Sequence, residues 1–252
     1  MENSNTRTQA GNLYVFVMNN PIMWIDPSGL SAMSASAMQS AAMSLANAAR
    51  SALSTIAEVR SEMESGASLL VLVGGMSVSG SSPHAPQHAS IQIFIAPGHA
   101  LWDTGRFREI WDGIGHATIG GFTANRGFSG ISGALGEIGQ PMVGFINDGF
   151  DMNRYALNSL THLPGVTAEQ VERMFLGTIP FNSRGAIPYD PTGIVSHNSN
   201  SFISGLLTYA GVTPPSMSGS VVGGFPGWNN PIPTRYFRPI PPIEVAPGHF
   251  AA

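Results

Sequence analysis

Residues 198–211 read NSNSFISGLLTYAG, and this stretch predicts the last helix of the domain, with one apolar face. Its apolar side chains recur every three or four positions and share one face: Phe202, Ile203, Leu206, Leu207 and Ala210. That spacing is typical of an α-helix with one side in a core. Gly211 is the residue type that most often ends a helix. We therefore expect a helix from about Ser199 to Ala210.

Upstream of this helix, short runs of β-branched and aromatic residues predict three strands, at Ile91–Ala96, His116–Phe122 and Met142–Ile146. Residues 167–170 read TAEQ, which is a capping box that begins a second helix. The core residues expected on that helix are Val171, Met174 and Phe175. Together these elements predict an α+β domain with a small antiparallel sheet packed against helices, over residues 90–215.

The residues before this domain have a different composition. Residues 32–64 are rich in Ala, Ser and Met with helical apolar spacing, and Gly66 follows as a candidate helix end. Leu69–Val73 is the longest aliphatic run, too short to span a bilayer, and it predicts a buried strand. Residues 75–90 are rich in Gly, Ser and Pro and predict a linker. The start of the chain lacks the apolar segment of a secretory signal.

Composition excludes several kinds of chemistry. The chain has 252 residues, of which 10% are charged, and it contains no Cys. All 11 basic residues are Arg, so a phosphate-binding or Schiff-base Lys is absent from this sequence, as is a thiol nucleophile or a Cys-ligated zinc. A net charge of −4 argues against a nucleic-acid partner. We expect no cofactor and no metal.

The residues best placed for catalysis are His116, which begins a predicted strand, and the polar cluster at Ser199, which begins a predicted helix. A helix N-terminus lowers the pKa of a nucleophile through its dipole and free N–H groups, and an adjacent imidazole acts as general base. His99 also follows a strand and competes with His116 for this role. His197 flanks the cluster, and His162 is expected at the surface.

Two other arrangements of polar residues are weaker. His84 and His88 lie in the predicted linker without a nearby carboxylate, so a two-histidine metal site is not favoured. Asp148 and Asp151 lie in a Gly-rich stretch, where such a pair is typical of a turn rather than of glycosidase chemistry.

Residues 12–30 read NLYVFVMNNPIMWIDPSGL, a pattern of two short strands separated by turns. This stretch resembles the end of the core region of Rhs-repeat proteins, which form a shell around a C-terminal toxin. The resemblance implies that Asp26, Pro27, Gly29 and Leu30 belong to the self-cleavage motif of that family, with the junction just after Leu30. It also implies that residues 1–30 are a shell remnant, which packs little against the later domain.

The later domain resembles circularly permuted papain-like hydrolases of the NlpC type. The resemblance rests on the order of GHATIG at 115–120, GFINDG at 144–149, TAEQ at 167–170, Tyr189-Asp190, NSNSF at 198–202 and AGVTP at 210–214. It implies that Ser199 occupies the nucleophile position and that His116 is the general base. Asn198 is the implied oxyanion contact, and Thr118, Asn125 and Asn147 are alternatives for the orienting residue.

Where that family has a cysteine, this chain has Ser199. The absence of any Cys fits a single Cys-to-Ser exchange that inactivates a harmful enzyme. Two alternatives stay open: a natural serine nucleophile, and a serine that only caps the helix. A Ser hydroxyl gains far less than a thiol from a helix terminus, because its pKa is much higher.

These resemblances imply a polymorphic toxin of the Rhs class, secreted by machinery such as type VI secretion and delivered into a target cell. The expected activity is hydrolysis of an amide or other acyl bond in a protein or in peptidoglycan, as a protease, amidase or glutamine deamidase. The expected partners are the Rhs shell, the secretion machinery and an immunity protein. The alternative is a non-catalytic toxin that disturbs membranes. The expected division is a shell remnant over 1–30, a helical segment over 31–89, the hydrolase over 90–215 and a Pro-rich extension over 216–252.

Overall fold

The fold was analysed in a computed structural model, in which the chain divides into two compact units, Met1–Ala42 and Met43–Ala252. All described residues belong to the second unit: 54, 57–77, 86–111, 113–123, 139–148, 157–184, 187–190, 192–193, 196–219 and 224–239. Residues 1–30, for which the sequence analysis expects a shell remnant, and the beginning of the Ala-rich segment lie outside them. Residues 57–64 are helical, and Gly66 follows with a positive φ of 104°.

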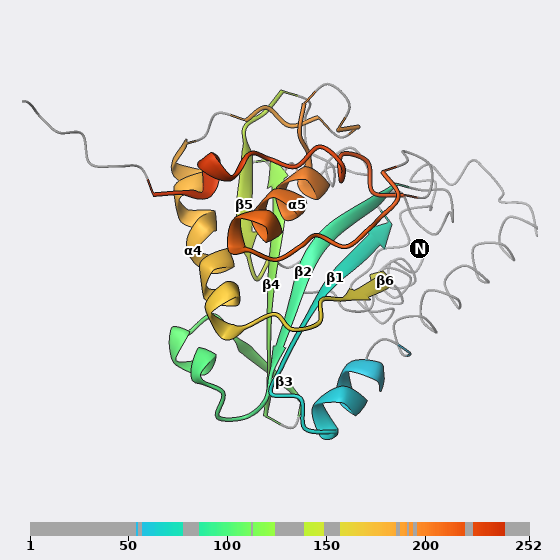
Figure 1. The fold of residues 1–252 in the computed structure, drawn as a ribbon, viewed down its shortest axis with the longest axis vertical. Coiled ribbons are helices and arrows are strands. Elements are labelled where there is room, and N and C mark those ends of the chain that lie inside the picture. Colours follow the sequence, from blue (N-terminus) through green and yellow to red (C-terminus); the bar gives the residue numbers. More distant parts are fainter. Residues whose placement is uncertain are drawn as a thin grey trace, which may run out of the picture. The chain divides into compact units, whose positions relative to one another are not determined.

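The centre of the unit is a six-stranded antiparallel sheet (Figure 1). Its strands are β1 (Leu69–Ser77), β2 (Gln87–Ile95), β3 (Arg108–Trp111), β4 (Ile114–Thr123), β5 (Met142–Ile146) and β6 (Leu157–His162). They are ordered β3-β4-β2-β1-β6, and β5 pairs with the far part of β4. The fold class is therefore α+β with a small antiparallel sheet, as the sequence predicts.

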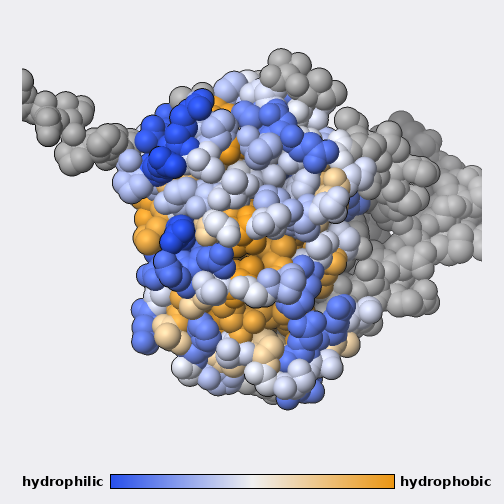
Figure 2. Space-filling view, viewed as in Figure 1, coloured by the Kyte–Doolittle hydropathy of each residue, from blue (hydrophilic) through white to orange (hydrophobic). Residues whose placement is uncertain are grey.

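Two helices cross one face of this sheet, α4 (Ala168–Arg184) and α5 (Ser199–Ala210) (Figure 1). The observed bounds of α5 are those expected from its apolar spacing, and Gly211 ends it with a φ of 79°. Short 3-10 helices lie at Ala100–Thr104 (η1) and Thr234–Phe237 (η3). Figure 2 shows apolar surface over the middle of this face with hydrophilic surface around it. Among the described residues, the large hydrophobic side chains that are exposed are Leu176 and Ile179 of α4.

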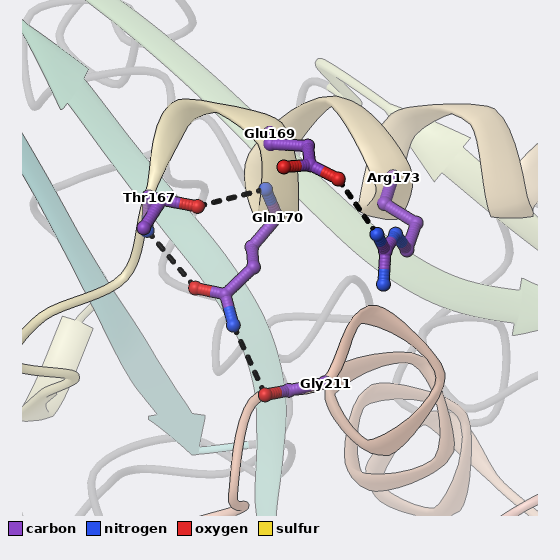
Figure 3. Close-up of polar contacts among 5 residues, drawn as sticks. All are labelled: Thr167, Glu169, Gln170, Arg173 and Gly211. Carbon is purple, nitrogen blue, oxygen red and sulfur yellow. Dashed lines mark hydrogen bonds and ion pairs between the residues drawn. The ribbon is translucent and has the colours of Figure 1, made fainter.

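The predicted capping box at the start of α4 is confirmed (Figure 3). The Thr167 hydroxyl accepts from Gln170 N–H at 3.3 Å, and Gln170 Oε1 accepts from Thr167 N–H at 3.0 Å. The amide of Gln170 also donates to Gly211 O at 3.0 Å, which joins the start of α4 to the end of α5. Val171, the next residue of the helix, is buried.

The two faces of the sheet carry separate apolar clusters. Odd-numbered residues of β2, such as Ile91, share a cluster with α4 and α5. Phe94 of β2 belongs to a second cluster on the opposite face, together with Val59 and Met63 of the 57–64 helix. This division follows from the two-residue side-chain period of a strand. Side chains on opposite faces of the sheet cannot contact each other, so this division limits which of the predicted site residues can lie together.

The predicted linker at 75–90 is wrong. Its two ends belong to β1 and β2, which pair from Leu69↔Ile95 to Ser77↔Gln87, so both strands are longer than predicted. The sheet accordingly begins at Leu69 rather than near residue 90. The sequence prediction also missed β3, β6 and η1.

The segment from Phe225 to Phe237 packs against the helices. Trp228 is buried, and its Nε1–H donates to Pro215 O at 2.9 Å. Phe237 is fully buried and stacks on Phe181 of α4, with ring centroids 5.3 Å apart. This segment therefore packs along α4 and α5, and it also reaches β1 through Phe225 and the N-terminus of α5 through Gly227.

Candidate functional site

The N-terminus of α5 is held by the side chain of Asn198. This residue is extended (φ −138°, ψ −170°), and its Oδ1 accepts from the N–H groups of Asn200 at 3.0 Å and Ser201 at 3.1 Å. Its Nδ2 donates to Pro226 O at 2.8 Å. Both ends of the amide are thus engaged, Oδ1 in capping the helix and Nδ2 in binding Pro226. The structure gives Asn198 a structural role, and the oxyanion contact that the resemblance implies stays a prediction.

Asn200 fastens the same turn to the sheet. Its Oδ1 accepts from Ala89 N–H at 2.7 Å, and its Nδ2 donates to Gln87 O at 2.9 Å. These backbone groups of β2 lie just beyond the end of the β2–β4 ladder, whose last pair is Ser90↔Gly120. The Asn200 carboxamide therefore occupies the place that β4 would take if the ladder continued.

Two glycine loops enclose the cap. Gly193 and Gly227 both have positive φ, of 64° and 81°. A Cβ on Gly193 would lie 2.5 Å from Gly227 Cα, and a Cβ on Gly227 would lie 2.6 Å from Asn198 Oδ1. Larger residues cannot fit at either position without moving the cap. The chain therefore uses glycine here to bring both loops against the first turn of α5.

Asp190 shapes the loop that leads into α5. The residue is buried, and its Oδ1 accepts from both the N–H and the hydroxyl of Thr192, at 2.9 and 2.7 Å. Its Oδ2 accepts from Ser196 N–H at 3.1 Å, and its own N–H donates to His197 O at 2.8 Å. This carboxylate fixes the position of the residues immediately before the helix.

Ser199 is the first residue of α5 and is 3% exposed. Within the described part of the chain, neither its hydroxyl nor its N–H has a hydrogen-bond partner. Phe202 lies one turn later on the same stripe, in contact with Gly121 of β4 and Gly144 of β5. Because Asn200 is bonded to the start of β2, the helix begins toward the end of β4. Ser199 therefore lies over the sheet beyond Gly121, on the side of Thr123.

Thr123 and Gln87 present buried polar atoms on this face. Thr123 is fully buried, and its Oγ1 has no hydrogen-bond partner among the described residues. The same holds for Oε1 of Gln87. The β2–β4 ladder ends at the Ser90↔Gly120 pair; Gln87 lies three residues before Ser90 on β2, and Thr123 lies three residues after Gly120 on β4. By the alternation of side chains along a strand, both point to the α5 face. Sequence reasoning missed both, because one lies in the predicted linker and the other at a strand end.

His116 lies on the other face of the sheet. It is fully buried on β4, and its imidazole stacks on Phe94, with ring centroids 4.5 Å apart. Its neighbour Ala117 belongs to the cluster that includes α5, so alternation directs His116 away from that helix. His116 also pairs with Phe94 of β2. Phe94 lies five residues along this strand, or about 16 Å, from Ala89, which is bonded to Asn200 at the N-terminus of α5. The structure does not bring His116 and Ser199 together, so the predicted dyad is not formed.

His116 instead belongs to a polar chain across β4 and β2. Its Nε2 lies 2.8 Å from Gln92 Oε1, and Gln92 Nε2 donates to Ser90 Oγ at 2.7 Å. Since the Gln92 amide nitrogen faces Ser90, its Oε1 faces the imidazole as an acceptor. His116 Nε2 therefore carries a proton. This arrangement explains how a polar face can be buried between apolar residues.

The alternatives for the orienting residue also have structural roles. Thr118 shares the His116 face, and its backbone N–H donates to Asn147 Oδ1 at 2.9 Å. Asn147 has a φ of 57°, and its Nδ2 donates to Arg106 O, so it ties β4 and β5 to the loop after η1. Asn125, like His84 and Asp151, lies outside the described residues.

The remaining histidines are placed as follows. His99 caps η1, with its Nδ1 accepting from Leu101 N–H at 3.1 Å, so it does not compete for catalysis at α5. His88 stacks on Phe122 at 4.3 Å, on the His116 face. His162 is exposed, as expected. His197 is partly buried, with Nδ1 3.1 Å from Asn230 O.

Searches against family models, curated proteins and solved structures found no match to this chain. Within the described residues, no three His, Asp or Glu side chains are grouped so that they could hold a metal ion. None of the helices described is long and apolar enough to cross a membrane. The α5 N-terminus, with Ser199, Thr123 and Gln87, is thus the candidate site that the geometry itself defines.

Proposed function

We propose that the chain is a toxin module with an acyl hydrolase site, in which position 199 carries the nucleophile. The observation that carries this proposal is the state of Ser199 at the first residue of α5. Ser199 is 3% exposed, and within the described residues its hydroxyl and its N–H make no hydrogen bond. The helix is capped by Asn198 instead. A serine needed only as a cap would occupy position 198 instead.

The chemistry follows from this position. A thiolate or alkoxide at the first helical residue attacks an acyl carbon, and the N–H of residue 199 together with the helix dipole stabilises the charge that develops on the carbonyl oxygen. The acyl–leaving-group bond breaks as a histidine donates a proton to the leaving group. Water then hydrolyses the acyl-enzyme, which releases the acid and restores the nucleophile.

The general base of this proposal is His197 in place of His116. A carbonyl only accepts hydrogen bonds, so the contact with Asn230 O places a proton on Nδ1 and leaves Nε2 as the acceptor in the neutral ring. Asn198 between the two residues is extended, which directs the side chains of positions 197 and 199 to the same side. No hydrogen bond joins the two side chains in the free protein, and such contacts tighten when substrate binds.

The permuted papain-like arrangement and the Rhs origin belong to the same proposal. The antiparallel sheet, the helix that begins at position 199 and the motif order along the chain support the first. The sequence at 12–30 supports the second, and with it delivery into a target cell, an immunity protein and a protein or peptidoglycan substrate. The proposal takes Ser199 as the replacement of a cysteine.

Thiol reactivity provides the direct test. The Ser199→Cys variant should titrate well below the ~8.5 of a free cysteine in iodoacetamide alkylation against pH. Ser204→Cys is the matched control, because Ser204 is 4% exposed in the middle of the same helix. The dipole effect falls off after the first turn, so that thiol should not be acid-shifted. Adding His197→Gln to Ser199→Cys should raise the thiol pKa by roughly one unit, whereas adding His116→Gln should leave it unchanged.

Expression in target cells, with mass spectrometry of proteins and analysis of muropeptides, tests the activity itself. Only Ser199→Cys should be toxic, and adding His197→Gln should remove the toxicity. Equal toxicity of the Ser199 protein would identify a natural serine hydrolase. An ordinary thiol pKa together with no toxicity would contradict the proposal.

A further inference from the structure

Two polar atoms at the candidate site are buried without a partner in the described structure, Thr123 Oγ1 and Gln87 Oε1. Leaving a buried polar group unsatisfied costs about 1–3 kcal/mol, so each such atom in a native fold needs an explanation. Thr123 is 0% exposed, although valine has the same shape and would avoid this cost. A ligand that supplies the missing partners would explain why the chain keeps these residues.

The two side chains lie on the same face of the sheet as the start of α5. Thr123 pairs with Met142, two positions from the Gly121↔Gly144 pair on which Phe202 packs, so its side chain lies on the α5 face. Gln87 is on the same face of β2 as Ala89, and its carbonyl is bonded to Asn200 of the first helical turn. Both side chains therefore border the space at the N-terminus of α5.

The hydrogen-bonding capacities of this site identify a chemical class. Gln87 Oε1 only accepts, the Ser199 N–H only donates, and the Thr123 hydroxyl does either. A ligand that satisfies all three must offer a hydrogen-bond donor and an acceptor close together. An amide has both groups, whereas an ester or a thioester has no N–H.

We propose that Gln87 and Thr123 determine specificity at the site, by selecting an acyl group that carries an amide N–H over an ester or thioester. Gln87 Oε1 accepts from the amide N–H, and the carbonyl oxygen takes the Ser199 N–H and the Thr123 hydroxyl. This inference rests on the proposed function, because it assigns the acyl group to the nucleophile at position 199. It narrows the expected reaction to amide substrates.

Two alkylating reagents test the selection directly in the full chain. Iodoacetamide and methyl iodoacetate react in the same way: the thiolate of the Ser199→Cys variant forms a C–S bond as iodide leaves. They differ in that only iodoacetamide has an N–H. The selectivity ratio is the rate with iodoacetamide divided by the rate with methyl iodoacetate. We expect this ratio in the Ser199→Cys protein to be well above the same ratio measured for a free thiol.

Substitutions in this background assign the ratio to the two residues. Thr123→Val and Gln87→Met keep side-chain size but remove the polar partner, and each should lower the ratio about fivefold, the size of one lost hydrogen bond. Thr123→Ser should retain it, and Thr213→Val, at an exposed position, should not change it. Thermal melting of each variant shows whether the fold is retained.

The outcomes separate this inference from the proposed function. An acid-shifted thiol whose ratio is the same in Thr123→Val and Gln87→Met overturns the inference and leaves the hydrolase proposal standing. A thiol that neither reagent reaches in the folded protein overturns both, because a substrate of similar size would be excluded as well.

Discussion

The two faces of the sheet differ in how they are buried, and this difference separates the candidate site from the residues that sequence reasoning favoured. On the α4 and α5 face, β2 and β4 present aliphatic residues such as Ile93 and Ile119, and helices cover them. On the other face the same strands present His88, Gln92 and His116, which are equally buried. Apolar packing fixes the position of α5, whereas on the opposite face hydrogen bonds link Ser90, Gln92 and His116. A buried histidine is therefore not by itself a mark of the face that carries the candidate site.

The largest effect is expected from the aromatic anchor of the helical face. Phe202 is fully buried, and its ring lies edge-to-face against Phe181 and Phe237, with centroids 4.9 and 5.6 Å away. Phe202→Ala should lower the free energy of unfolding by about 3–5 kcal/mol, measured by urea denaturation. The control is Leu176→Ala, since Leu176 is 49% exposed and its loss should cost much less. Equal losses for the two would contradict the packing described.

The second prediction concerns Asn200, which joins α5 to the edge of the sheet. Its Nδ2 donates to the carbonyls of Gln87 and Pro226, each at 2.9 Å. In Asn200→Asp an oxygen would face those carbonyls, and the buried site would raise the pKa of the new carboxyl above its unfolded value. The loss of stability, about 2–4 kcal/mol at pH 7, should therefore shrink as the pH falls toward 4.

Asn200→Ala provides the control for that experiment, because it removes the same contacts without adding a titratable group. The difference between its free energy of unfolding and that of the unmodified protein should not change over the same pH range. If Asn200→Asp showed an equally flat profile, the two carbonyls could not be the groups that face position 200.

A smaller effect is expected on the face away from the helices. Gln92→Leu removes the group that links His116 to Ser90, and should cost about 1–3 kcal/mol in urea denaturation. Gln92→Leu also removes the donor to Ser90. Ser90→Ala should therefore lower the free energy of unfolding less in the Gln92→Leu background than in the unmodified protein, with a coupling energy of about 0.5–3 kcal/mol. Strict additivity would show that the polar chain is not a unit.

The sequence was sufficient where one local pattern determines the structure. The bounds of α5 follow from its apolar period and from Gly211, and the Thr167–Gln170 box begins α4 as predicted. The position of Ser199 at a helix N-terminus follows in the same way. In each case the interacting residues lie within one or two helical turns.

The sequence-based prediction failed where contacts between residues far apart in the sequence determine the structure. The stretch at 75–90 has linker composition, yet β1 and β2 extend into it because they pair with each other, and Gly75 is needed beside Ser159 and Phe225. The assignment of His116 depended on a face of β4, and a shift of one residue reverses that face. Gln87 became a candidate only when the fold left its Oε1 buried without a partner in the described structure.

The smallest effects are expected at the surface link between α4 and α5 (Figure 3). Thr167→Ala removes the hydroxyl that caps α4 and should cost about 1 kcal/mol, as is usual for a lost cap. Arg173→Ala breaks the exposed pair with Glu169, at 2.8 Å, and should cost only about 0.3 kcal/mol, less at high salt. Gln170→Ala should lie nearer the first value, because its amide holds both Thr167 N–H and Gly211 O. If Gln170→Ala behaved like Arg173→Ala, the bond to Gly211 would contribute nothing, and α4 and α5 would be joined by apolar packing alone.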